Sequence, residues 1–490
     1  MTQKRRVIVP AILGNVVEYY DFGMYAIFAP IIGSTFFPGN TESDRILLAF
    51  LVFAIGFFMR PLGGLIFGHI GDRFGRKISL NISIVGMALS TFTIGVLPGY
   101  SQFGITATII LIIVRMVQGI CIGGEGSGSA IFIIEHFSKK SLGIIGSVVM
   151  ASNVFGNLLS VIVAIFITKT WGVDEFTWRY GFILGAIMGI YGSYARSKSA
   201  ETPIFHEIKQ KKKLLRTPIR DVIGNKRKAL GLIVALAAAA TSASYIIRAY
   251  MNTFFLKIMG YPADQSLYFC CFCLTGLILF LPLFGFLAEK VGQRTFLKFA
   301  AVGIMLVAIP VFKMISNPAM DARLVYCGLF IMSITTAAIL APAYPCAIKM
   351  FPPELRFSGV ALGWNTGNAI FGGTTPFIAT LLAERFSVIG PAYYLIFTSA
   401  IFIVVNRFLY QNSYEMLRQH ISNKTEFPND HDTSVGSNAQ NNKLKERIKQ
   451  RKLNAKKNDQ QLVDALRNNL LRRKTSQNTK NCVEDIDNLK

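Results

Sequence analysis

The sequence predicts an all-α integral membrane protein, with twelve transmembrane helices in two pseudo-symmetric halves of six. Three observations support this fold class: an apolar composition, a one-sided distribution of basic residues and an internal repeat. Of the 490 residues, 52% are hydrophobic and 16% are charged, whereas soluble globular domains carry about 25% charged residues. Lipid is the solvent that suits this excess of apolar side chains, so we expect the chain to cross the bilayer many times.

Twelve predominantly apolar stretches are candidate membrane-spanning helices, because about 20 residues of helix cross the hydrocarbon core of a bilayer. The expected spans are 7–33, 46–70, 78–98, 106–136, 142–168, 180–196, 229–256, 267–290, 295–315, 322–350, 358–383 and 389–411. They divide the chain into an N-terminal half (1–196), a basic linker (197–228), a C-terminal half (229–411) and a polar basic tail (412–490). We expect the tail, which is rich in Asn, Gln, Lys and Asp, to be partly disordered.

Basic residues are concentrated in alternating loops, in the linker and in the tail. Residues 196–228 hold eleven Lys or Arg against three acidic residues, and residues 412–490 hold sixteen against ten. By the positive-inside rule these segments face the cytoplasm beside anionic lipid, which places both termini inside and requires an even number of spans. The net charge of +24 therefore reflects membrane topology, and no nucleic-acid partner is expected.

An internal repeat indicates two halves of equal architecture. Residues 68–77 read GHIGDRFGRK and residues 285–294 read GFLAEKVGQR, each directly after the second span of its half. Repeats of this kind are a transporter architecture in which the solute site lies between the halves.

Both repeated loops are expected to act in gating. Their glycines allow close backbone approach, an acid can face a helix terminus, and basic residues can pair with carboxylates or lipid phosphates. The expected gating residues are Gly68, Asp72, Arg73, Gly75, Arg76 and Lys77 in the first loop, and Gly285, Glu289, Lys290, Gly292 and Arg294 in the second.

Three acidic residues lie well inside expected spans, away from the span ends, where an ionisable side chain costs at least about 2.5–3.5 kcal/mol and therefore indicates function. Glu18 and Asp21 share one face of the first span. Two close carboxylates resist double ionisation, so one should hold its proton more tightly, which suits proton coupling. A structural pair bonded to a neighbouring helix is the alternative. Glu125 is the expected second carboxylate of the cavity; its glycine-rich surroundings lack the Lys-Ser/Thr of a nucleotide-binding loop.

Two arginines and several aromatic residues lie in spans expected to line the cavity. Arg60 can bind a solute carboxylate or pair with an acid of the first span, and Arg248 favours an anionic solute or requires an acidic partner. Aromatic faces attract an ammonium group by about 0.5–2 kcal/mol per contact; plain packing is the alternative role of each ring. The candidates are Tyr19, Tyr20, Tyr245, Tyr344 and Trp364, with Asn365 next to the last.

The 68–77 loop resembles the loop motif of the major facilitator superfamily position for position. Further motifs extend the resemblance over residues 5–410 and are similar to those of the metabolite:proton symporter family, most of all to its proline/glycine-betaine symporters. These motifs lie at residues 15–22, 60–64, 115–119, 123–125, 178–179, 351–359, 363–367, 372–373 and 376.

This resemblance implies the major facilitator fold and proton symport of a zwitterionic osmolyte, such as proline or glycine betaine, in a bacterial inner membrane. It implies that Asp21 and Glu125 couple transport to protons, and that the partners are a small solute and protons, without cofactor or metal. The seventh span departs from the pattern, because the proline/betaine symporters look apolar where Arg248 stands and have a proline where Asn252 stands.

Other functions stay open beside the osmolyte symporter. The same fold can carry a carboxylate such as 2-oxoglutarate, or serve as a solute sensor without transport. A membrane-embedded enzyme is disfavoured, because the chain has only five histidines and no evident nucleophile–base cluster. No oligomeric state is predicted.

Overall fold

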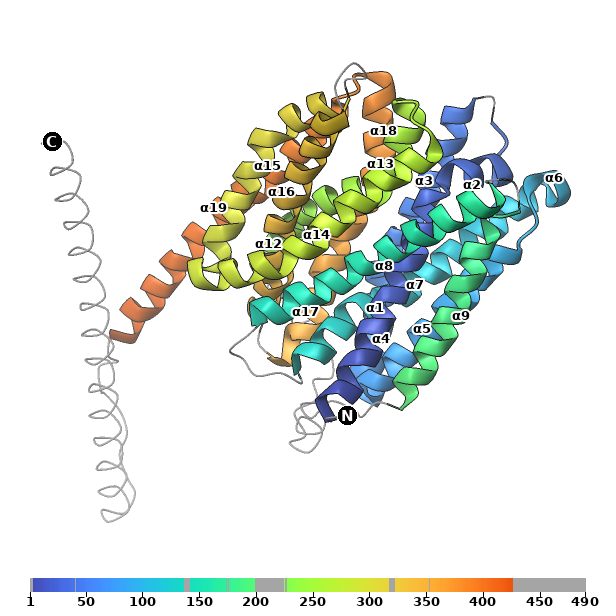
Figure 1. Ribbon diagram of the computed structural model, residues 1–490. Coiled ribbons are helices and arrows are strands. Elements are labelled where there is room, and N and C mark those ends of the chain that lie inside the picture. The colour runs from blue at the N-terminus through green and yellow to red at the C-terminus, as the bar shows by residue number, and fades with distance from the viewer. Residues whose placement is uncertain are drawn as a thin grey trace, which may run out of the picture. The chain divides into compact units, whose positions relative to one another are not determined.

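The chain folds into helices, and no strand occurs among the residues that the structure describes (Figure 1). The computed structural model describes residues 3–39, 41–135, 142–172, 174, 176–198, 224, 227–316, 322–351 and 353–425. Most of the predicted linker and tail lie outside these residues. The helices up to Met416 form one compact unit, and the second unit, from Leu417, is described only as far as Thr425.

Helical segments occupy the six spans expected in the N-terminal half. They are α1 (Gln3–Ile27), α2 (Ala29–Phe36), α3 (Glu42–Phe58), α4 (Arg60–Phe74), α5 (Arg76–Val96), the short α6 (Tyr100–Phe103), α7 (Ile105–Glu135), α8 (Leu142–Trp171) and α9 (Arg179–Ser197). The break between α3 and α4 falls at Met59, two residues before Pro61, because proline is accommodated in the first turn of a helix and not in its interior.

The C-terminal half contains π-helical segments, labelled η, in its seventh and eleventh spans. Its elements are α12 (Arg227–Tyr245), η2 (Ile246–Tyr250), α13 (Met251–Thr253), η3 (Phe254–Ile258), α14 (Ala263–Val291), α15 (Gln293–Ile315), α16 (Ala322–Lys349), α17 (Pro353–Gly367), η4 (Asn368–Gly372), α18 (Thr375–Arg385) and α19 (Gly390–Thr425). Such wide turns are rare and are frequently found at functional sites.

Nine helices of the described chain are long and apolar enough to cross a membrane. The other three expected spans, 7–33, 180–196 and 358–383, are helical but lie outside this set, so the number twelve stays a prediction. Their composition explains the difference, since they carry buried charged or polar side chains that face the interior. Large apolar side chains such as Leu89, Phe299 and Leu306 are strongly exposed on other helices, as expected of a surface that meets lipid.

The halves meet along two equivalent pairs of helices. Helix α8 packs along α14, and α4 packs on α17. Each pair joins the second span of one half to the fifth span of the other, so the repeat detected in the sequence is also the repeat of the interface (Figure 1). Within the halves, α1 packs on α8 and α5 on α9, while α14 and α15 pack on α16.

The two repeated loops have the same backbone geometry. Gly75 separates α4 from α5 with φ of 122°, and Gly292 separates α14 from α15 with φ of 100°. Side chains rarely adopt such positive φ values, so the position requires glycine in both loops. We call the end of the bundle that carries these glycines the motif end, and the opposite end the far end; α2, α13 and α18 lie at the far end (Figure 1).

Candidate functional site

The charged side chains that the sequence places within spans are gathered inside the bundle. Glu18, Asp21, Arg60 and Glu125 are each no more than 2% exposed. Burial of this degree in an apolar chain demands partners or a function. The structure shows that these groups divide into a central cavity and two closed networks beside it.

The central cavity has a volume of about 30 Å³, room for a water molecule or two and too little for an organic solute. It lies between the halves. Its lining consists of Tyr19, Arg60, Ile122, Met150, Asn153, Thr241, Ser244, Tyr245, Arg248, Leu340, Tyr344, Trp364, Asn365 and Asn368. The structure therefore brings together seven of the eight residues that the sequence analysis expects to line the cavity, all except Tyr20.

Arg248 enters this cavity from the π-helical turn η2 and connects the two halves. Its Nε donates to Asn157 Oδ1 on α8, and its Nη1 donates to Ser244 Oγ at 3.0 Å. The guanidinium lies 4.4 Å from the ring centre of Tyr19 and 5.2 Å from that of Tyr245. Asn157 in turn donates to the Tyr19 carbonyl at 2.5 Å, so one amide fixes both the arginine and the first helix.

Arg60 reaches the same cavity from the start of α4. Its guanidinium stacks 3.8 Å from the ring centre of Phe57 and 4.7 Å from that of Phe22. Phe57 also packs edge to face on Tyr245, with 5.1 Å between ring centres. Arg60 is thus held by aromatic faces, and no ion pair to an acid of the first span is recorded among the residues described.

Several polar atoms around the cavity have no hydrogen-bond partner within the described part of the chain. They are Arg60 Nη2, Arg248 Nη2, the Tyr245 hydroxyl, Asn153 Oδ1 and Asn368 Oδ1. Buried polar atoms in folded proteins are nearly always bonded. Their concentration around one cavity marks the place where a polar solute would supply the partners.

Glu18 differs from the other two buried carboxyls. It is fully buried, and neither of its oxygens accepts a hydrogen bond from any described residue. Arg60 and Arg248 are within electrostatic reach of it. Glu18 is therefore the carboxyl whose protonation is least constrained by hydrogen bonds to neighbouring groups.

Asp21 and Glu125 each belong to a closed network within the N-terminal half. Asp21 accepts from Gln118 Nε2, and Arg115 donates to Gln118 Oε1 at 2.5 Å, so Gln118 links the aspartate to the arginine. Glu125 forms a two-pronged ion pair with Arg196, at 2.6 and 2.7 Å, and accepts from Ser83 Oγ at 3.1 Å. A proton can reach Glu125 only when this pair is loosened.

Tyr20 lies away from the cavity, which differs from the expectation. Its hydroxyl donates to the Gly181 carbonyl on α9 at 2.8 Å, and its ring is fully buried against that helix. Neighbouring positions on a helix point about 100° apart, so Tyr19 and Tyr20 cannot both face the same cavity.

Trp364 and Asn365 close the cavity toward the motif end. The Trp364 ring packs edge to face on Tyr344, with 4.9 Å between ring centres. Asn365 Nδ2 donates to the Gly123 carbonyl of the other half at 3.1 Å. Asn365 thus joins the halves as well as lining the cavity.

The structure describes the side chains of most of the residues predicted to act in gating. Glu289 accepts from the backbone N–H of Gly143 at the start of α8, at 2.6 Å, across the halves. Gly285 faces Gly143 so closely that a Cβ there would lie 2.8 Å from its carbonyl oxygen. Gly68 and Arg76 are buried, Lys77 is half-buried, and the Lys290 ammonium lies 4.4 Å from the Phe286 ring centre. The side chains of Asp72 and Arg73 lie outside the described residues; Arg294 lines a cleft of about 640 Å³ with Lys349.

The halves are linked at the far end too. Asn252 Nδ2 donates to the Ile27 carbonyl at 3.1 Å, Lys257 forms an ion pair with Glu42, and Ser43 donates to Glu384 at 2.8 Å. Contacts on both sides of a small central cavity describe an occluded arrangement.

The sequence analysis did not single out several residues that organise this site. Asn157, Gln118 and Asn368 are neutral amides, which composition does not distinguish from other helix residues. Arg196 was counted with the linker charges, although it is buried at the end of α9. Its position as the last residue of an expected span, and not beyond that span, is the signal that would have identified it. In the described residues no group of three His, Cys, Asp or Glu side chains is placed to hold a metal ion.

Comparisons with known proteins agree with this geometry. Residues 11–356 match the family model of the Major Facilitator Superfamily. The chain is 30% identical to the proline/betaine transporter of Escherichia coli, over 82% of either chain. It is 29% identical to the glycine betaine/proline/ectoine/pipecolic acid transporter OusA of Dickeya dadantii, over 84% of this chain and 85% of that one.

Among solved structures, the chain resembles the major facilitator proton:xylose symporter XylE bound to a bromodeoxyglucose. The TM-score is 0.68 at 16% identity, over 84% of this chain and 96% of that one. A partially occluded inward-open form of XylE from E. coli matches with a TM-score of 0.65 at 18% identity, over 84% and 98%. At these identities the likeness concerns the fold alone. The chain belongs to the major facilitator superfamily: it is a multi-pass membrane protein and a solute transporter, not an enzyme.

Proposed function

We propose that the chain is a proton symporter that imports zwitterionic osmolytes of the proline and glycine-betaine type. The observation that carries this proposal is the composition of the central cavity. Two guanidinium groups with unbonded nitrogens line a space walled by aromatic rings. The names of the two similar transporters support the same solute class.

Each end of a zwitterion has a suitable partner in this cavity. A carboxylate accepts charge-assisted hydrogen bonds from guanidinium nitrogens, which are stronger than bonds between neutral groups. A secondary or quaternary ammonium group is attracted to aromatic faces such as those of Tyr245, Tyr344 and Trp364. Tyr19 already stacks on Arg248, so a solute would contact this ring from its free side.

Glu18 is the leading candidate for the coupled proton, followed by Asp21 and Glu125. An ionised carboxylate that is buried without donors is costly, so Glu18 gains most by carrying a proton or by having a cationic group beside it. Binding a zwitterion near Arg60 and Arg248 changes the field at Glu18, which links its protonation to solute occupancy. Glu125 already has its charge balanced by Arg196, whereas Asp21 is bonded through one oxygen to the neutral Gln118 and its Oδ1 has no partner in the described chain.

Transport proceeds by alternating access in this proposal. The halves rock about the central cavity, and the contacts at the motif end and at the far end open in turn. By the positive-inside rule, the basic residues favour a cytoplasmic position for the motif end and both termini, and Arg294 and Lys349 lie beside a cleft suited to anionic lipid. In this orientation the far end opens to the outside.

A second candidate solute is a carboxylate such as 2-oxoglutarate. The observation in its favour is that two arginines and only one carboxyl lie in or beside the cavity, which leaves an excess of positive charge. No observation on the described residues favours a sensor without transport.

Uptake into proteoliposomes separates these candidates. Labelled proline, glycine betaine and 2-oxoglutarate are offered under an imposed inward proton gradient, with and without protonophore. We expect protonophore-sensitive accumulation of proline or glycine betaine. Accumulation of 2-oxoglutarate alone would move the chain to the carboxylate class and make Arg248 its principal ligand. Equilibrium binding without net flux would favour the sensor.

A further inference from the structure

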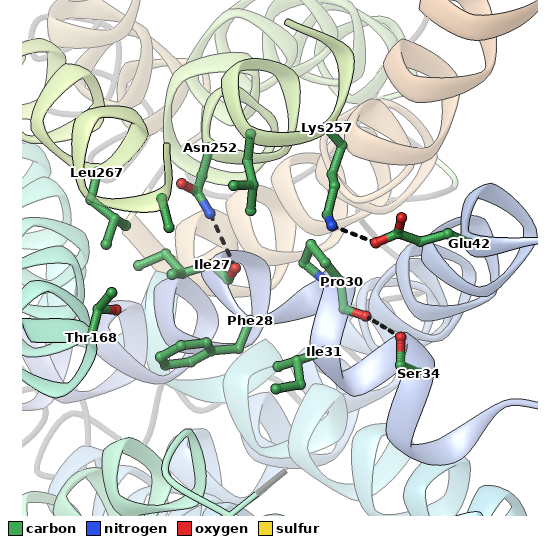
Figure 2. A pocket seen from close by; sticks show the side chains of 12 residues that line it. Ile27, Phe28, Pro30, Ile31, Ser34, Glu42, Thr168, Asn252, Lys257 and Leu267 are labelled. Atoms are coloured by element: carbon green, nitrogen blue, oxygen red, sulfur yellow. Dashed lines mark hydrogen bonds and ion pairs between the residues drawn. The ribbon is translucent and has the colours of Figure 1, made fainter. Parts of the chain in front are cut away.

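A second pocket lies between the halves at the far end of the bundle (Figure 2). Its volume is about 280 Å³, against about 30 Å³ for the central cavity. This approaches the lower end of the range of small-ligand pockets, about 300 Å³. Its walls come from α1, α2, α3 and α8 on one side and from α13, η3 and α14 on the other. We call it the far-end pocket.

The walls of the far-end pocket are apolar and its edge is charged. Figure 2 shows Phe28, Ile31 and Leu267 around the space, with Lys257 and Glu42 together at one side. The lysine belongs to the C-terminal half and the glutamate to the N-terminal half, so opposite charges approach from opposite halves. The pocket thus offers one site for an anion, one for a cation and an apolar surface between the helices.

The charged pair can be opened at little cost. The Lys257 side chain is 32% exposed and the Glu42 side chain 55% exposed, and surface pairs of this kind contribute little to stability because solvent screens them. A zwitterion brings a carboxylate for Lys257 and a cation for Glu42, so it replaces the pair without leaving either charge unmatched. A dianion would match Lys257 and be repelled by Glu42.

A thin partition separates the far-end pocket from the central cavity. Asn252 lines the pocket and lies four residues after Arg248, which lines the cavity. Its side chain is fixed on both sides: Nδ2 donates to the Ile27 carbonyl, and Oδ1 accepts from Ser266 at 2.8 Å. Arg248 and Asn252 are the two positions at which the seventh span departs from the proline/betaine pattern. Both side chains bond to the N-terminal half, about one helical turn apart.

We propose that the far-end pocket is a second binding site, which takes a small zwitterionic solute before the solute enters the central cavity. Lys257 holds the carboxylate and Glu42 holds the ammonium group, while the carbon skeleton of the solute faces the apolar wall of the pocket. Breaking the Asn252–Ile27 hydrogen bond then admits the solute to Arg248. This inference rests on the proposed transport of zwitterions and adds a site to it.

Equilibrium binding of labelled glycine betaine to the purified full-length protein tests the proposal. The variants are Lys257→Gln, Glu42→Gln and Arg248→Ala. Arg385→Gln is the matched control, because Arg385 is an exposed charge at the same end that does not line the pocket. The double variant Glu42→Lys/Lys257→Glu restores both charges with their positions exchanged.

We expect two classes of site in the wild-type protein and in Arg385→Gln. Arg248→Ala should keep only the weaker class. Lys257→Gln and Glu42→Gln should weaken that class about five- to tenfold and raise KM for uptake, and the exchanged pair should recover most of the loss.

Two outcomes overturn the proposal. One is a single class of site in a wild-type protein that transports glycine betaine. The other is binding by Lys257→Gln and Glu42→Gln equal to that of the Arg385 control. Failure of the proposed function gives a different result, namely no glycine betaine uptake by the wild-type protein.

Discussion

The two halves share an architecture but differ in the chemistry of their interiors. No charged side chain of the described C-terminal half is buried as deeply as those of the N-terminal half. The charged residue that the C-terminal half contributes to the cavity lining is the half-buried Arg248. The charges buried in the N-terminal half are Glu18, Asp21, Arg60, Arg76, Arg115, Glu125 and Arg196.

The buried charges make contacts within one half, whereas Arg248 makes a contact between the halves. The Glu125–Arg196 pair and the Asp21–Gln118 link lie within one half, so rocking of the halves leaves them intact. The Arg248–Asn157 bond crosses the halves, so the proposed alternating access would have to break it in each cycle. Breaking a buried ion pair costs far more than exchanging one hydrogen bond, which explains why the charged networks are confined to one half.

The largest effect is expected from removing the Glu18 carboxyl, whose oxygens have no hydrogen-bond partner in the described chain. Glu18→Gln should abolish proton-driven accumulation, because an amide carries no exchangeable acid proton. Solute counterflow in proteoliposomes should persist, because it needs no net proton movement. Asp21→Asn is the matched comparison and should lose less. Full uphill uptake by Glu18→Gln would refute its role and return the assignment to Asp21 or Glu125.

The second-largest effect is expected from removing the Glu125–Arg196 ion pair of the same half. Glu125→Ala should destabilise the protein by about 3–5 kcal/mol, because Arg196 is left buried without its partner. Thermal unfolding in detergent measures this effect. The double variant Glu125→Leu/Arg196→Met should recover most of the stability. If Glu125→Ala unfolds at the wild-type temperature, the pair is not a fixed part of the half.

A smaller effect is expected from the crossing arginine. Arg248→Ala should raise KM for proline about ten- to a hundredfold, since a hydrogen bond to a charged group contributes about 1.5–3 kcal/mol. The loss for 2-oxoglutarate should be larger, because its two carboxylates depend more on positive charge. Uptake assays with both solutes decide this. Equal losses would assign Arg248 to joining the halves rather than to solute selection.

The smallest effects are expected at the neighbouring residues Tyr19 and Tyr20, of which only Tyr19 lines the central cavity. Tyr20→Phe removes a buried hydrogen bond to Gly181 and should cost about 0.5–1.5 kcal/mol of stability without changing KM. Tyr19→Leu removes an aromatic wall of the cavity and should raise KM. A raised KM for Tyr20→Phe, at unchanged stability, would contradict the position of that side chain.

The fold was largely predictable from the sequence because lipid imposes a simple rule on composition. Apolar length located the spans, and the repeat at 68–77 and 285–294 located the interface between the halves. Interior charges and π-helical turns did not by themselves hide a span. The fourth span, with Arg115 and Glu125, and the seventh, with η2 and η3, still meet the apolar criterion.

The site was predictable residue by residue but not as a network. Charged and aromatic side chains within spans stand out, so Arg60, Arg248 and Tyr245 were found. Asn157, the partner of Arg248, and Gln118, which links Asp21 to Arg115, were not assigned a role, because an amide has no sequence signal and acquires its role only from what lies opposite. Tyr20 was misplaced for the same reason, since helical phase alone does not say which of two adjacent rings faces inward.

The exposure of the Glu42–Lys257 pair has a consequence for the medium in which the protein works. Dissolved ions screen exposed charges beyond about 8 Å at 0.15 M ionic strength and at still shorter range in concentrated salt, whereas buried contacts are screened much less. Added salt therefore loosens the far end of the bundle while Arg248–Asn157 and Glu125–Arg196 keep their strength. The two links between the halves therefore respond differently to ionic strength, and a rise in salt weakens the exposed Glu42–Lys257 pair more than the Arg248–Asn157 bond.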